Sequence, residues 1–130
     1  MQHYHAVVWL DHREARVLFF DKETFEEVDL KEKGHKMHLH HKKGSVTGKR
    51  TPEDQHFFQE IVDALKPAQE WLVVGPGSAK LELVKHIHKH ASQLSDHVVG
   101  VETVDHPTDR QLVAHARAYF KAADEMRPQT

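Results

Sequence analysis

Hydrophobic positions cluster in three short blocks at the start of this chain, at 5–10, 15–20 and 24–30, with polar turns between them. The first block, HAVVWL, is nearly continuous, as expected for a strand that is buried on both faces. The third is weaker and places Val28 and Leu30 on one face. Short polar connections favour antiparallel hairpins. The pattern therefore predicts an opening meander of three strands.

The rest of the chain alternates helical and strand patterns. Thr51 suits a helix N-cap and Pro52 the first helical position. An apolar stripe with helical spacing follows, made of Phe57, Phe58, Ile61, Val62 and Leu65. Two more helices are predicted, from Ser78 as cap to about 91, and from His106-Pro107, with Asp105 as a capping residue, to about 126. Strands are predicted at 71–74 and 98–104.

This order, β-β-β-α-β-α-β-α, predicts an α/β fold in which a mixed five-stranded sheet carries helices on its faces. The 130 residues suit a single domain spanning 1–130. The chain has no cysteine, which excludes disulfides and thiolate zinc sites. No apolar run approaches the ~20 residues of a membrane-spanning helix, and the first residues lack a signal-peptide pattern. We therefore expect a cytoplasmic protein without a membrane segment.

Charge is distributed unevenly along the chain. Residues 31–50, here called the basic segment, contain seven Lys or Arg and one acid, Glu32, which gives +6. Because the whole chain carries −2, the other 110 residues carry −8. The basic segment has three glycines and neither helical nor strand periodicity, so it predicts a long functional loop. Such a loop is typical of an anion-binding surface on an acidic body.

The basic segment predicts contacts with RNA, because clustered cations bind phosphates and histidines can stack on bases. The candidate RNA-binding residues are Lys33, Lys36, His38, His40, His41, Lys42, Lys43, Lys49 and Arg50. The histidines could instead bind a metal ion, since His38 and His40 would share one side of a strand. Neighbouring lysines oppose a cation, so we expect neither a metal site nor a cofactor.

Two other functions stay open at this point. One is a metal-dependent phosphoesterase or nuclease that uses Asp11 and the loop histidines. Such enzymes need several converging carboxylates, and Gly75 and Pro76 stand where one is wanted after the fourth strand. The other is a protein-interaction module for an acidic partner. No complete catalytic constellation is present, so we expect no enzyme activity.

Two weaker features adjoin these. His86, His88 and His90 lie on the second predicted helix, among Lys80, Lys85 and Lys89, and could extend the basic surface or form a solvated face. The turn at 75–78 precedes a helix N-terminus, which favours anions. That turn lacks both the Walker and the dinucleotide-binding glycine patterns.

The stretch from Trp71 to Lys80, WLVVGPGSAK, together with the opening meander and the long basic loop, resembles the middle domain of archaeal and eukaryotic peptide chain release factors and of Pelota. The chain looks most like the small bacterial stand-alone versions of that domain. The resemblance implies a ribonuclease-H-like fold and a role in translation.

One motif of release factors is absent. They carry Gly-Gly-Gln in the loop after the third strand, whereas residues 34–45 here read GHKMHLHHKKGS. Peptide release is therefore not implied. Pelota also lacks this motif and binds ribosomes without hydrolysing peptidyl-tRNA. We accordingly expect a non-catalytic module that binds the ribosome or RNA through the basic segment.

Overall fold

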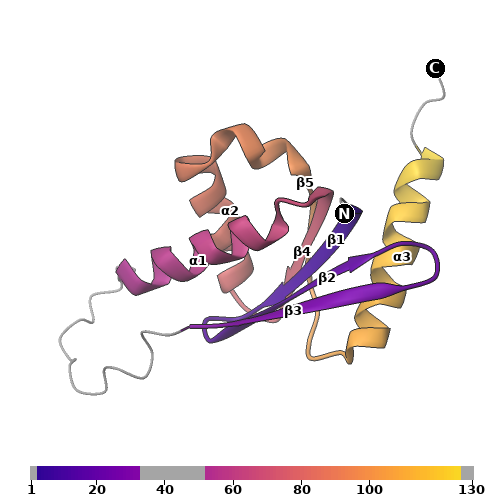
Figure 1. Ribbon diagram of the computed structural model, residues 1–130, viewed down its shortest axis with the longest axis horizontal. Helices are drawn as coiled ribbons and strands as arrows, with labels where there is room; N and C mark the ends of the chain where they lie inside the picture. Colours follow the sequence, from indigo (N-terminus) through magenta and orange to yellow (C-terminus); the bar gives the residue numbers. More distant parts are fainter. Residues whose placement is uncertain (1–2, 33–51, 127–130) are drawn as a thin grey trace.

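The computed structural model describes residues 3–32 and 52–126 (Figure 1). In these two ranges the elements are β1 (His3–Leu10), β2 (Glu14–Phe20), β3 (Phe25–Lys31), α1 (Pro52–Leu65), β4 (Ala68–Gly75), α2 (Ala79–His90), the short 3-10 helix η3 (Ser92–His97), β5 (Val98–Thr103) and α3 (Asp109–Met126). The predicted order of strands and α-helices is confirmed. The 3-10 helix η3 was not predicted.

The strands form one mixed sheet in the order β3-β2-β1-β4-β5. Strands β1, β2 and β3 pair antiparallel as the predicted meander, whereas β4 lies parallel to β1, and β5 lies parallel to β4. Val8 at the centre of β1 pairs with Val17 on one side and Val73 on the other. This order is compatible with the ribonuclease-H-like label that the resemblance implies.

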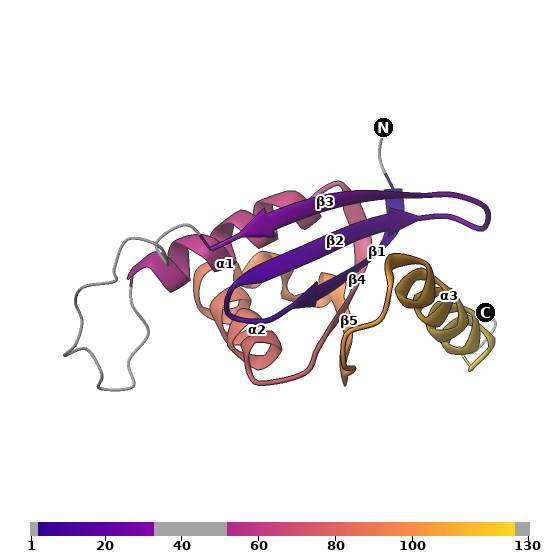
Figure 2. The ribbon, with the colours of Figure 1, turned by 90° about the horizontal axis from the view of Figure 1, so that it is seen from below.

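Helices cover both faces of the sheet (Figure 2). On one face α1 and α2 bury the apolar stripe of α1 against Val8 and Trp71. On the other face α3 packs Leu112, Ala116 and Phe120 against alternate strand residues that include Trp9. The nearly continuous apolar runs of β1 and β4 are thus buried on both faces, as predicted.

Two boundaries and the caps of two helices differ from the prediction. Strand β4 begins at Ala68 rather than 71, because its first residues pair with the start of β1 and Glu70 lies 3.4 Å from His5. Ser78 precedes α2 but does not cap it with its side chain. Its hydroxyl lies 3.2 Å from the carboxylate of Glu82.

Helix α3 begins later than predicted. The cap is Thr108, whose Oγ accepts the backbone N–H of Gln111 at 3.1 Å, while the Gln111 side chain accepts the backbone N–H of Thr108 at 2.9 Å. This reciprocal pair is a capping box. The prediction that Asp105 caps the helix was wrong, because its side chain is almost fully exposed.

No helix within residues 3–32 and 52–126 is long and apolar enough to cross a membrane.

Candidate nucleic-acid interface

The basic segment joins the fold at one edge of the sheet. The parallel strands β1, β4 and β5 all end at this edge, here called the carboxyl edge, and the antiparallel meander brings the end of β3 there too. The first turn of α1 lies at the same edge (Figure 1). Ligands of open α/β sheets bind outside the carboxyl ends of strands. Topology therefore places the described start of the basic segment, and the helix that follows it, at the edge where binding sites usually form.

The β1–β2 turn is held rigidly. Asp11 accepts the backbone N–H groups of Arg13 and Glu14 on one carboxylate oxygen, at 2.8 and 2.9 Å. Its own N–H donates to the carbonyl of Glu14 at 3.0 Å. These bonds explain an aspartate here by turn formation alone. Asp11 thus has a structural role in this turn.

The same turn anchors the basic segment at its first described residues. Glu32 donates its backbone N–H to the carbonyl of Arg13 at 2.8 Å, immediately after β3. Lys31 is exposed, 3.8 Å from Glu14. The nine candidate RNA-binding residues, Lys33, Lys36, His38, His40, His41, Lys42, Lys43, Lys49 and Arg50, lie outside the described residues, as does the predicted cap Thr51.

The start of α2 is tied to this turn as well. His12 lies 3.1 Å from Glu82, the carboxylate that also meets Ser78. Gly75, before α2, allows β4 to end against β1, because a Cβ at Gly75 would lie 2.3 Å from the carbonyl oxygen of Leu10. The Gly-Pro-Gly turn therefore has a packing function at its first glycine.

The first turn of α1 is fixed by a buried histidine. His86 of α2 is 6% exposed, and its two ring nitrogens lie 2.8 Å from the amide oxygen of Gln55 and 2.9 Å from that of Gln59. The suggestion that His86 and Lys80 extend a basic surface was wrong. Lys80 is also buried and donates to the carbonyl of Gly77. The exposed members of that set are Lys85, His88, Lys89 and His90.

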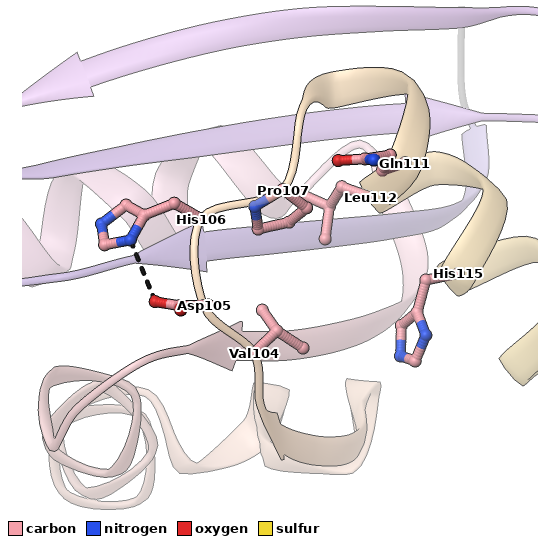
Figure 3. Close-up of a pocket in the computed structure, with 7 residues that line it drawn as sticks. All are labelled: Val104, Asp105, His106, Pro107, Gln111, Leu112 and His115. Atoms are coloured by element: carbon pink, nitrogen blue, oxygen red, sulfur yellow. Dashed lines mark hydrogen bonds and ion pairs between the residues drawn. The ribbon is translucent and has the colours of Figure 1, made fainter.

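A pocket that the sequence did not predict lies between the β5–α3 connection and the first turns of α3 (Figure 3). It encloses about 380 Å³. His106 lies 3.2 Å from Asp105, and His115 contacts Glu102 of β5. Trp9 holds the connection by donating its indole N–H to the carbonyl of Asp105 at 2.6 Å. Its lining residues lie close together in the sequence, between 104 and 115, where Asp105 and His106 were interpreted only as the start of a helix.

Carboxylates crowd together between β3 and the start of α3. Glu27 forms side-chain hydrogen bonds with Asp29 and Asp109, which raise its pKa to about 7 from the ordinary 4.5. Arg16 binds Asp109 at 2.6 Å and the carbonyl of Pro107 at 3.0 Å. In the described part of the chain no three His, Asp or Glu residues are arranged to hold a metal ion.

Several solved structures share this fold. Archaeoglobus fulgidus Pelota is 14% identical with a TM-score of 0.63, and the match covers 91% of this chain and 32% of that protein. Thermoplasma acidophilum Pelota is 18% identical, with a TM-score of 0.58, over 83% and 30% of the two chains. The archaeal translation termination factor aRF1 is 14% identical, with a TM-score of 0.54, over 94% and 38%.

The chain has the fold found in Pelota and in this termination factor. The predicted resemblance is thereby confirmed at the level of fold. The chain spans about a third of the length of these solved structures. No protein-family model matches it, and no curated protein matches it.

Proposed function

We propose that this chain is a non-catalytic module of the translation machinery, a single cytoplasmic domain over 1–130 that binds ribosomal RNA through the basic segment. Two observations together carry this proposal, the fold of the chain and the place where its cationic stretch is inserted. The fold is that of translation termination-like factors, and the most cationic stretch of the sequence is inserted at the carboxyl edge of its sheet. Saccharomyces cerevisiae Dom34, which shares the fold at a TM-score of 0.54, is described as involved in RNA quality control pathways and as interacting with Hbs1.

The electrostatics support a polyanionic partner. Residues 31–50 carry +6 against −8 for the rest of the chain, so the basic segment would approach phosphates while the acidic body is repelled from them. At the described base of the segment, the backbone is anchored by the Glu32–Arg13 bond and the α1 turn by His86. A binding loop on a rigid frame is a common arrangement for recognition.

The nuclease alternative has less support. Its proposed carboxylate, Asp11, is engaged by two backbone N–H groups of its own turn. No carboxylate follows β4, where Gly75 packs against β1 instead. We expect no metal-dependent cleavage of RNA or of an RNA–DNA hybrid. Cleavage that Asp11→Asn abolishes would establish the alternative.

The direct test is co-sedimentation of the full chain with purified ribosomes, from about 50 to about 300 mM salt. Binding should be complete at low salt and lost steeply as salt rises, because phosphate contacts release counterions. A chain that stays in the supernatant even at low salt would remove the RNA proposal. Retention by an acidic protein in a parallel pull-down would then favour the interaction-module alternative.

The pH dependence separates RNA binding from a metal site in the same segment. Imidazole has an ordinary pKa near ~6.5, so lowering the pH from about 7.5 to about 6 adds positive charge among the lysines. RNA affinity should therefore increase. A metal site shows the opposite trend, since a protonated imidazole cannot bind a metal.

A further inference from the structure

Strand β3 is an outer strand of the sheet and has one unpaired side among the described residues (Figure 2). The backbone bonds from Asp21 to Thr24 and from Glu32 to Arg13 flank its pairing with β2. Bonded pairs alternate in an antiparallel ladder, so the even-numbered residues of β3 bond to β2. The N–H and C=O groups of residues 25, 27, 29 and 31 consequently point away from the sheet.

This edge has charged side chains, at Glu26, Glu27, Asp29 and Lys31, but it lacks two other common protections against pairing. Its register with β2 runs unbroken over seven pairs, without a bulge, and β3 contains no proline. Phe25 is 36% exposed and Val28 is 38% exposed. A regular strand with free backbone groups and exposed apolar side chains is a template for an added strand.

The two faces of this edge differ in chemistry. Side chains alternate between faces along a strand, so Glu27, Asp29 and, at the end, Lys31 share the face toward α3. Val28 and Leu30 share the other face with Glu26. Glu27 and Asp29 crowd against Asp109, which Arg16 binds, while Lys31 is exposed and lies 3.8 Å from Glu14. The raised pKa of Glu27 reflects this excess of carboxylates. The α3 face of the edge therefore favours additional positive charge.

We propose that the free edge of β3 binds an extended segment of a partner protein, with Lys or Arg at alternate positions and apolar residues between them. Backbone hydrogen bonds would add the segment as a sixth strand. Its cations would face Glu27 and Asp29, and its apolar side chains would lie beside Val28 and Leu30. This interaction surface is separate from the proposed RNA contacts of the basic segment and does not depend on them.

A second copy of the chain is a poorer occupant. Antiparallel pairing of two β3 strands about Val28 would place Glu27 of each copy opposite Asp29 of the other. Like charges directly opposite one another destabilise a strand pair. Charge complementarity thus favours a partner segment that contains Lys or Arg over a second copy of this chain.

The test uses the full chain and a synthetic peptide, Lys-Val-Lys-Val-Lys-Val-Lys, with blocked ends. The control peptide has the same sequence but carries backbone N-methyl groups on the alternate residues whose N–H groups would donate to β3. These groups keep the charge of the peptide and remove those hydrogen bonds. Fluorescence anisotropy at low salt should show binding of the first peptide and affinity lower by about tenfold or more for the second. Equal affinities would overturn the proposal in favour of general electrostatic attraction.

Two substitutions of one residue separate backbone from charge. Asp29→Asn removes the charge and keeps the outward N–H, whereas Asp29→Pro removes both, at an edge position that tolerates proline. Circular dichroism checks that each variant is folded. We expect the proline variant to bind the peptide more weakly than the asparagine variant. E27K with D29K should reduce affinity by about tenfold or more.

Equal binding by the two Asp29 variants would argue against strand addition. A chain that dimerises through β3 and ignores the peptide would overturn the proposal and identify a second copy as the occupant. Ribosome binding by the same variants should be unchanged, so this inference and the proposed function can fail independently.

Discussion

At the scale of single residues, Gly75 shows how the carboxyl edge is closed. A Cβ at this position would meet the carbonyl oxygen of Leu10 at 2.3 Å, whereas a Cβ at Gly77 would meet nothing within 4 Å. Gly75→Ala should therefore lower the free energy of unfolding by about 1–3 kcal/mol, the usual cost of overpacking. Gly77→Ala is the matched control and should stay within about 0.5 kcal/mol of the natural chain. Urea unfolding measures both, and equal stabilities would contradict the close approach of β4 to β1.

Glu27 gives a second prediction at this scale. Its pKa is raised from 4.5 to about 7, so its contribution to stability is fully present below pH 4.5 and is lost as pH rises through 7. Glu27→Gln keeps a hydrogen-bonding side chain without the charge. It should match the natural chain at pH 4 and exceed it at pH 8 by up to about 1 kcal/mol, because solvent screens exposed pairs. Thermal unfolding at several pH values across this range measures the difference in stability between the two chains. A difference that does not change with pH would contradict the raised pKa of Glu27.

At the scale of elements, α3 depends on its capping box. Thr108→Ala should cost about 1 kcal/mol, because the N–H of Gln111 loses its acceptor. Thr108→Ser is the control, since serine keeps the hydroxyl oxygen. The pattern Thr-x-x-Gln at 108–111 is visible in the sequence. The start was nevertheless predicted too early, because His106-Pro107 has the pattern of a cap followed by proline. Loss of stability in the alanine variant alone would confirm where the helix begins.

Elements were predictable where their own residues carry the period. The α1 stripe is buried as predicted, because helical spacing on one apolar face needs no distant partner to be recognised. The start of β4 was missed, because Gln69 and Glu70 break the apolar run and extend the strand only by pairing with β1. The 3-10 helix η3 was also missed, whereas the start of β5 at Val98 was predicted correctly.

At the scale of the whole molecule, sequence order predicted the mixed five-stranded sheet. Side-chain contacts across the fold were not predictable. From the sequence, His86 was interpreted as part of a basic helix face. In the structure it is buried against Gln55 and Gln59, which are 31 and 27 positions away. The charge of the segment, by contrast, is a property of composition and needs no structure to be counted.

That charge leads to the last prediction, which concerns the molecule as a polyelectrolyte. Replacing Lys42, Lys43 and Lys49 together by alanine removes three cations from the basic segment. If each contacts one phosphate of single-stranded RNA, the slope of log affinity against log salt should become shallower by about 2, since each contact contributes roughly 0.7. Filter binding at several salt concentrations measures this slope.

The matched control removes three lysines elsewhere, at Lys22, Lys66 and Lys121, which are all exposed. Lys22 lies in the β2–β3 turn and Lys66 in the α1–β4 turn, at the edge opposite the carboxyl edge, so their loss changes net charge equally without removing a proposed RNA contact. Replacing Lys66 also breaks its exposed ion pair with Asp63, which contributes little to stability. Both variants should have a free energy of unfolding close to that of the natural chain, because exposed substitutions rarely cost more than about 0.5 kcal/mol. A slope that falls equally in the two variants would mean that net charge alone attracts RNA. A slope reduced only by the first would assign the phosphate contacts to the basic segment.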